Sequence, residues 1–240
     1  MKKILNVQIS KTTPEYDIIM RAQGIPRGIK PDEKTLKLIE DSISVYRKLS
    51  RPVGIIREIS KDEFENIFKG EGMNEKYTPV EPIYRNSDDL ALYAATIEED
   101  ICEEISRQFE IGEYALGSML DAVASEGAEM TAQALEEIYR GHLINIKRFS
   151  PDHGILRFSP GYCGWHVSGQ KKLFKSLRPE DIGIELNSSY LMQPLKSISG
   201  IIISGKKEFF SFDDSFSFCA DCATHSCRER IKAIQKRERI

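Results

Sequence analysis

The sequence predicts a single α+β domain. Apolar runs that are typical of strands lie among segments in which apolar residues recur every three or four positions, as they do in helices. The 240 residues contain no repeat, no low-complexity tract and no obvious linker. A chain of this length can bury a sizeable core, so we expect one large domain rather than two small ones.

The composition is that of an ordinary soluble globular protein, with 40% hydrophobic and 30% charged residues. The net charge of -3 gives no argument for binding nucleic acid or an anionic membrane. No apolar run is long enough to span a bilayer, and the first residues lead into no signal sequence, so we expect a cytoplasmic protein. The five cysteines are odd in number and three of them cluster near the C-terminus, unlike a secreted disulfide framework.

In the first half of the chain the clearest element is a helix over residues 33–49. Asp32 is a residue type that caps helices, and apolar residues follow it at spacings of three and four. Pro52 ends this helix. The other elements expected here are a strand over residues 4–9, an apolar patch at 18–20, a strand over 53–59, one short helix within 61–90 and a strand over 90–96.

The second half is dominated by a long helix over residues 114–143, preceded by a shorter one at 98–109. Glycine inside a helix costs roughly 1 kcal/mol relative to alanine, so Gly127 indicates close packing against another element. The remaining expected elements are a helix over 170–177 capped by Ser168, strands over 182–186 and 198–203, a polar loop over 188–196 and a basic helix over 228–240.

Residues 157–170, RFSPGYCGWHVSGQ, combine a cation, a turn and two aromatic rings. Proline followed by glycine at 160–161 predicts a tight turn, because proline presets φ and glycine accepts a positive φ. Small residues then alternate with Tyr162 and Trp165, so a flat ligand could lie against exposed backbone while Arg157 holds an anionic group bidentately. The alternative is a tight turn with a structural arginine and two aromatic rings in the core.

Glu129 lies between Ala128 and Met130 on a helix face that is otherwise apolar. A carboxylate in such a setting must be paired or solvated within a pocket, which makes Glu129 a candidate binding residue. The alternative is an ordinary half-exposed glutamate on the helix surface. His142 and His153 are flanked by ordinary residues, and we interpret both as surface residues.

The C-terminal cysteines form the pattern Cys219-x-x-Cys222-x-x-x-x-Cys227. A gap of two residues lets both thiolates reach one metal ion, as in zinc knuckles and iron–sulfur sites. A structural zinc site needs four ligands, and His225 or Cys163 could supply the fourth. The spacing does not separate zinc from an iron–sulfur cluster, and reduced cytosolic thiols are the alternative to either metal.

Two separated motifs resemble one known family. The stretch Arg157-x-x-Pro160-Gly161-Tyr162 is followed, in the same order, by Met192-x-Pro194-x-Lys196-Ser197-x-Ser199-Gly200. Over residues 15–210 the sequence resembles the activation (reactivation) domain of cobalamin-dependent methionine synthase, in a stand-alone form. The resemblance implies a bent antiparallel sheet flanked by helices, with an S-adenosylmethionine-binding activation domain at 1–212 and a cysteine-containing tail at 213–240.

That family binds S-adenosylmethionine and presents its methyl group to a corrinoid cofactor, so that oxidised cob(II)alamin is reduced and methylated. By resemblance, Arg157 would take the methionine carboxylate, and Glu129 would bind the amino group or the ribose. The backbone of Tyr162, Cys163 and Gly164 would meet the adenine. The Tyr162 ring would lie near the reacting methyl group, which makes it the catalytic candidate, because aromatic faces suit a sulfonium cation.

The chain departs from the family pattern at several positions. Asn187-Ser188-Ser189 stands where the family usually has Thr-Glu-Ser, which removes one acidic contact, and Phe209-Phe210 replaces an expected tyrosine. A further N-terminal aspartate contact of the family would fall to Asp17. The cysteine tail lies outside the family pattern, so its role does not follow from the resemblance.

The chain has no D-x-H-x-x-G signature of a cobalamin-binding domain. The expected partner is therefore a separate corrinoid protein, or a methionine synthase that lacks its own activation domain, with flavodoxin or ferredoxin as electron donor. The tail is expected to help docking or electron delivery. The alternative is a non-catalytic adaptor that docks on a corrinoid protein and whose cysteines hold a metal; a third possibility is a redox protein built on an iron–sulfur tail.

Overall fold

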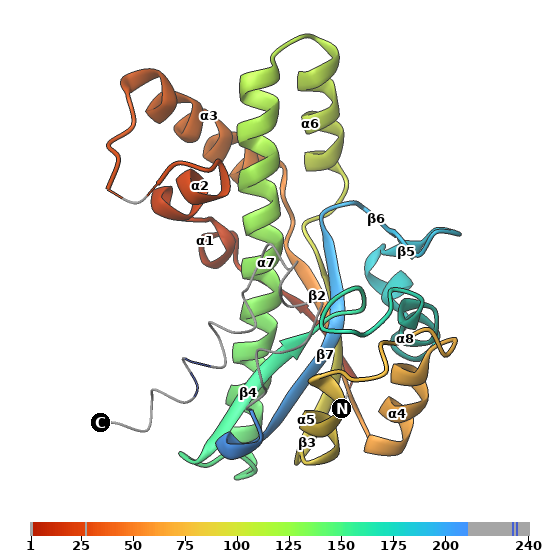
Figure 1. Ribbon diagram of the computed structural model, residues 1–240. Coiled ribbons are helices and arrows are strands. Elements are labelled where there is room, and N and C mark those ends of the chain that lie inside the picture. Colours follow the sequence, from red (N-terminus) through yellow and green to blue (C-terminus); the bar gives the residue numbers. More distant parts are fainter. Residues whose placement is uncertain (1, 27, 211–231, 233, 235–240) are drawn as a thin grey trace.

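The structure, a computed structural model, describes residues 2–26, 28–210, 232 and 234 (Figure 1). Its centre is a five-stranded sheet in the order β1-β2-β3-β7-β4, and every neighbouring pair of strands is antiparallel. The strands of this sheet are β1 (Lys2–Asn6), β2 (Val53–Ile59), β3 (Asp89–Thr96), β4 (His153–Phe158) and β7 (Ser197–Lys206). A separate two-stranded ribbon consists of β5 (Glu185–Leu186) and β6 (Met192–Gln193).

Helices cover both faces of the sheet (Figure 1). The longest, α7 (Tyr114–Asn145), has 32 residues, so it is about 48 Å long and extends beyond the sheet that it packs on. In the part of the chain that the structure describes, no helix is long and apolar enough to cross a membrane. The other helices are α1 (Ile9–Thr12), α2 (Tyr16–Ala22), α3 (Glu33–Leu49), α4 (Lys61–Lys69), α5 (Val80–Arg85), α6 (Asp100–Glu110) and α8 (Gly169–Leu177), with 3-10 turns η1 (Pro179–Ile182) and η2 (Lys207–Phe209).

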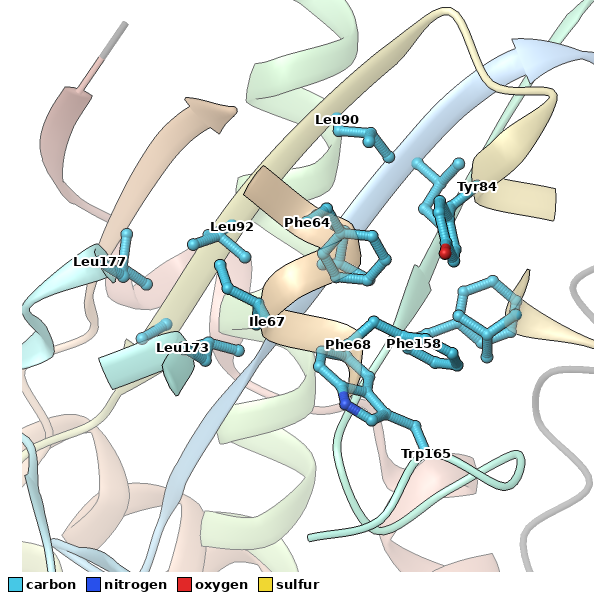
Figure 2. Packing of buried hydrophobic residues seen from close by; sticks show 14 of the residues in the cluster. Phe64, Ile67, Phe68, Tyr84, Leu90, Leu92, Phe158, Trp165, Leu173 and Leu177 are labelled. Atoms are coloured by element: carbon cyan, nitrogen blue, oxygen red, sulfur yellow. The ribbon is translucent and has the colours of Figure 1, made fainter. Parts of the chain in front are cut away.

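The central strands β3 and β7 are buried on both faces, so most of their residues are apolar or small, and alternate side chains enter two different clusters. In β7, Ile202 packs toward α7 with Leu135 and Tyr139. Its neighbours Ile201 and Ile203 point to the opposite face, into a cluster built with α4, α5 and α8. Figure 2 shows that second cluster, in which the rings of α4 and the leucines of α8 surround the side chains of β3 and β4.

A third cluster lies beyond the sheet, where the N-terminal half of α7 packs with α2, α3 and α6. Tyr46 of α3 is fully buried there, and a Cβ at Gly127 of α7 would overlap its hydroxyl oxygen. The expectation that Gly127 marks close packing is confirmed. The same helix therefore contributes its first half to a helical cluster and its second half to the face of the sheet.

The sequence-based expectation of one antiparallel sheet flanked by helices is confirmed, and several elements agree closely. Helix α3 has the expected bounds, and the Asp32 carboxylate accepts a hydrogen bond from the Thr35 amide at 2.8 Å. The strand expected over 4–9 is wrong at its end, because Ile9 already begins α1. The strand expected over 182–186 is wrong at its beginning, since Pro179 starts a 3-10 turn that Gly183 ends with a φ of 74°, and it is confirmed only at Glu185–Leu186, which form β5.

A candidate ligand site around Arg157

Arg157 lies on β4 and faces α7. It is paired with Ile202 of β7, and its side chain is only 8% exposed. The guanidinium carbon lies 5.8 Å from the centroid of the Tyr93 ring on β3, within the range of a cation–π contact. Its Nε donates to Oε2 of Glu136 at 3.1 Å. The arginine is therefore a buried cation anchored to both the sheet and the long helix.

Glu129 is the second carboxylate of this cluster. Its Oε2 lies 3.8 Å from Arg157 Nη1, which is an ion pair but is beyond hydrogen-bond distance. The Glu129 side chain is 61% exposed, so it stands at the solvent side of the buried guanidinium. Burial opposes the charged form of Arg157, but Tyr93, Glu136 and Glu129 outweigh it and raise the pKa of Arg157. The cation is thus fixed in its charged form, with one tightly bonded carboxylate and one looser, exposed one.

The turn after β4 presents Tyr162 to solvent. The Gly161 amide donates to the Trp165 carbonyl at 2.7 Å, and the Trp165 amide donates back to the Tyr162 carbonyl at 3.0 Å. Three residues of the turn have a positive φ, namely Gly161 at 92°, Cys163 at 54° and Gly164 at 74°. Cys163 adopts this conformation although only glycine does so without strain. The turn is closed on itself by its own backbone.

The two aromatic rings of the turn have different positions. Tyr162 is 55% exposed, whereas Trp165 is 1% exposed and packs edge-on against Phe64 of α4, with 5.5 Å between ring centroids. Figure 2 shows Trp165 beside Phe68 within the core. The expectation of two core aromatics is therefore right for Trp165 and wrong for Tyr162. Trp165 anchors the turn, and Tyr162 is its exposed ring.

Neighbouring segments hold this turn in place. The Glu75 amide donates to the Gly164 carbonyl at 3.0 Å, and the His166 amide donates to Asn74 Oδ1 at 2.9 Å. On the other side, the hydroxyls of Tyr93 and Ser159 lie 3.3 Å apart. Tyr93 therefore contacts both Arg157 and the start of the turn, which couples the cation to the backbone that follows it.

Lys196 lies beside the same helix at the beginning of β7. Its Nζ is 2.7 Å from Asp121 Oδ1 and 2.8 Å from Ser125 Oγ, both on α7. Its side chain is 16% exposed. Asp121, Ser125 and Glu129 are spaced by four residues, so they lie on one stripe of α7. The stripe meets Lys196 at one end and Arg157 at the other.

Asp17 is exposed on α2, a helix that packs against α7. Its backbone carbonyl accepts a hydrogen bond from Arg21 Nε at 3.3 Å. Burial, and then the carboxylate of Glu129, raise the pKa of Glu126 on α7, and the charge of Arg21 only partly offsets this rise. Asp17 therefore lies on a helix that packs beside α7.

A cavity of about 470 Å³ lies between the second half of α7 and the edge strand β4. Its lining includes Arg157, Glu136, Arg140, Lys207 and Phe149. The cluster around Arg157 thus borders open space on this side.

The predicted metal ligands Cys219, Cys222 and Cys227, together with His225, lie outside the described residues. Within residues 2–26 and 28–210, and at 232 and 234, no group of three or more His, Cys, Asp or Glu side chains could hold a metal ion. Cys163, the other suggested ligand, lies half-buried in the turn. The metal expectation for the tail stays a prediction.

Sequence reasoning identified Arg157, Glu129 and Tyr162 but missed Glu136 and Tyr93. Glu136 follows Glu129 by seven residues, which is two helical turns and hence the same face, so that spacing could have indicated it. Tyr93 lies in a fully buried strand and contributes an ordinary core aromatic to the pattern. Only the sheet register, which pairs Tyr93 with Gly200 next to β4, brings it to the site.

The fold and this cluster define a class: a single α+β domain in which a charged site lies between an antiparallel sheet and one long helix. Residues 79–214 match the family described as the activation domain of vitamin B12-dependent methionine synthase, which is more than half of the chain. The protein belongs to this family. The matched segment contains Glu129, Arg157, Tyr162 and Lys196.

A solved structure, described as the crystal structure of the MetH reactivation domain bound to AdoHcy, is similar to this chain with a TM-score of 0.61. The similarity covers 97% of this chain and 89% of that chain, at 13% sequence identity. At that identity the similarity establishes the shared fold. No curated protein sequence matches the chain.

Proposed function

We propose that this chain binds S-adenosylmethionine at the Arg157 cluster. It would support the reductive methylation, and so the reactivation, of a cob(II)alamin or other corrinoid cofactor carried by a separate protein. The single observation that carries the proposal is the buried Arg157 with Glu129 at its solvent side, on the strand that leads into the turn of the exposed Tyr162, in a chain of this family. Further support comes from the similar MetH domain, whose structure has AdoHcy bound.

The Arg157–Glu129 pair suits the amino-acid end of the ligand. An α-amino acid carries a carboxylate and an ammonium group a few ångströms apart, and the two side chains offer the complementary charges. Because Nη1 and Glu129 Oε2 are 3.8 Å apart, a ligand can exchange that long contact for two charge-assisted hydrogen bonds. Glu136, bonded to Nε, would keep the guanidinium oriented during the exchange.

The turn suits the rest of the ligand. The backbone at Cys163 and Gly164 has a positive φ and carries no bulky side chain, as a flat adenine would require. Tyr162 is the exposed ring nearest in sequence to this backbone, and an aromatic face stabilises a sulfonium cation. We assign Tyr162 to the reacting methyl group, and Asp17 to the outer rim of the site.

The corrinoid would come from the partner, either a corrinoid methyltransferase protein or a methionine synthase without its own activation domain. Reductive methylation needs one electron from a donor such as flavodoxin or ferredoxin, and a methyl group from S-adenosylmethionine, which leaves AdoHcy. Residues 1–212 would form the binding domain. The tail at 213–240 would help docking or electron delivery, through a bound zinc ion or iron–sulfur cluster if its cysteines hold one, and the protein would act in the cytoplasm.

The first test is calorimetric titration with S-adenosylmethionine of the wild-type protein, Arg157→Ala and a control, Arg107→Ala. Loss of hydrogen bonds between charged groups costs roughly 1.5–3 kcal/mol, so Arg157→Ala should weaken binding by about tenfold to a hundredfold. Arg107 lies on the surface of α6 and pairs only locally with Glu104, so its removal should leave the affinity unchanged.

The second test measures methylation of a separate corrinoid protein in the presence of a reductant. Wild-type protein should methylate the corrinoid with S-adenosylmethionine, and Arg157→Ala should not at the same ligand concentration. A wild-type protein that binds a corrinoid protein but takes up no S-adenosylmethionine, even in that complex, would contradict the proposal and favour the adaptor function.

A further inference from the structure

Lys196 is a largely buried cation that the proposed ligand contacts do not use. It precedes β7, and its three-donor ammonium group bonds Asp121 at 2.7 Å and Ser125 at 2.8 Å. Alternate residues of β7 share a face, so Lys196 lies on the same side as Ile198, Gly200 and Ile202, which face α7. The lysine therefore joins the beginning of the central strand to the long helix.

The contact bears directly on Glu129. Ser125 and Glu129 are one helical turn apart, about 6 Å along the axis, on the stripe that begins with Asp121. Lys196 holds the first two members of the stripe, and the third lies 3.8 Å from Arg157. A rotation or slide of α7 against β7 would therefore move Glu129 away from Arg157.

On the face of β7 toward α7, Ile198 and Ile202 pack into the apolar clusters that α7 enters. Between Lys196 and Ile202, on the face toward α7, Gly200 contributes no side chain, because a Cβ there would overlap the carbonyl oxygen of Phe158. The contact of Lys196 with Asp121 is directional, whereas the apolar contacts of Ile198 and Ile202 are not. The lysine end of this pair is largely buried and the Asp121 end is about half-exposed, so the pair links the start of β7 to the rim of α7.

We propose that Lys196 is a positioning residue of the site: through Asp121 and Ser125 it sets the position of α7, and so holds Glu129 opposite Arg157. This inference rests on the proposed function, since it concerns how the S-adenosylmethionine site is assembled. Lys196 itself need not touch the ligand.

The test is the affinity for S-adenosylmethionine of Lys196→Met, Lys196→Arg and Lys206→Met. Lys206, at the other end of the same strand, is exposed and serves as the matched control. Lys196→Met should weaken binding by about tenfold, the effect of losing the one charge-assisted hydrogen bond between Glu129 and the ligand. Lys196→Arg can still reach Asp121 and should restore most of the affinity, whereas Lys206→Met should bind as the wild type does.

A double-mutant cycle with Glu129→Gln separates positioning from general stabilisation. If Lys196 acts through Glu129, Lys196→Met should cost no further affinity in the Glu129→Gln background. A merely structural lysine would lower the thermal midpoint, but its effect on binding would not depend on Glu129.

The outcomes distinguish the two proposals. If the wild-type protein binds S-adenosylmethionine and Lys196→Met binds it equally well, the positioning role is overturned and the proposed function stands. The positioning role is also overturned if the loss is the same with and without Glu129. If the wild type does not bind S-adenosylmethionine at all, the proposed function fails first, and the positioning role fails with it.

Discussion

At the first residue of β3, the Asp89 carboxylate is buried and forms an ion pair with Arg148, which follows the end of α7. Burial raises the pKa of Asp89, while the guanidinium of Arg148 acts in the opposite direction. A carboxyl whose pKa is raised on folding favours the folded state when protonated. Its ionisation therefore lowers the free energy of unfolding as the pH rises from its unfolded pKa through its folded pKa. Arg148 limits that cost at neutral pH.

Removing the cation should expose this cost. We expect Arg148→Met to lower the free energy of unfolding at pH 7 by about 1–3 kcal/mol, because a buried carboxylate loses its partner. The pKa of Asp89 would rise further in this variant. The difference in unfolding free energy from the wild type should therefore shrink as the pH falls and Asp89 becomes protonated. Urea unfolding at several pH values, beside the exposed neighbour Lys147→Met, measures this. A deficit that is independent of pH would contradict the assignment to Asp89.

At the scale of the element, α7 contains two glycines in opposite surroundings. A Cβ at Gly127 would overlap the Tyr46 hydroxyl, whereas none of the described residues lies within 4 Å of a Cβ at Gly141. The first glycine permits a close helix contact, and the second only weakens the helix. The same substitution at the two positions should therefore have opposite effects.

We expect Gly127→Ala to destabilise the protein by about 1–3 kcal/mol through overpacking, and Gly141→Ala to stabilise it by up to about 1 kcal/mol through helix propensity. Each serves as the control for the other. Thermal or urea unfolding monitored by circular dichroism gives both values. Equal changes in unfolding free energy in the same direction would show that the close contact with Tyr46 does not explain the glycine at position 127, Gly127.

Elements with strong local signals could be predicted from the sequence, and those set by distant contacts could not. Asp32 caps its own helix, so α3 was predictable to the residue. Strand β4 was missed because Gly154 and Arg157 interrupt a run of only six residues, and its partner β7 is far away in the sequence. The same holds for the site, where Arg157 lies in a local motif but Tyr93 reaches it only through the sheet register.

At the scale of the whole molecule, α7 belongs to both the helical cluster and the sheet, so neither can lose its structure without exposing part of the other. We expect a single unfolding transition, with a calorimetric enthalpy equal to the van't Hoff enthalpy. Ile39→Ala in the helical cluster and Leu177→Ala in the cluster on the other face of the sheet should each keep that one transition and lower its free energy of unfolding by about 2–5 kcal/mol. A second transition in either variant would mean that the two parts unfold independently.

Trp165 is the one tryptophan of the sequence, and it is a buried residue of the turn that follows β4. Its indole packs among the rings of α4, while its carbonyl oxygen accepts the hydrogen bond that closes the turn at Gly161. In optical terms, all of the indole emission of this protein therefore originates a few residues from Tyr162. The emission of this one indole should therefore respond both to unfolding of the core and to a change in the turn, without any added label.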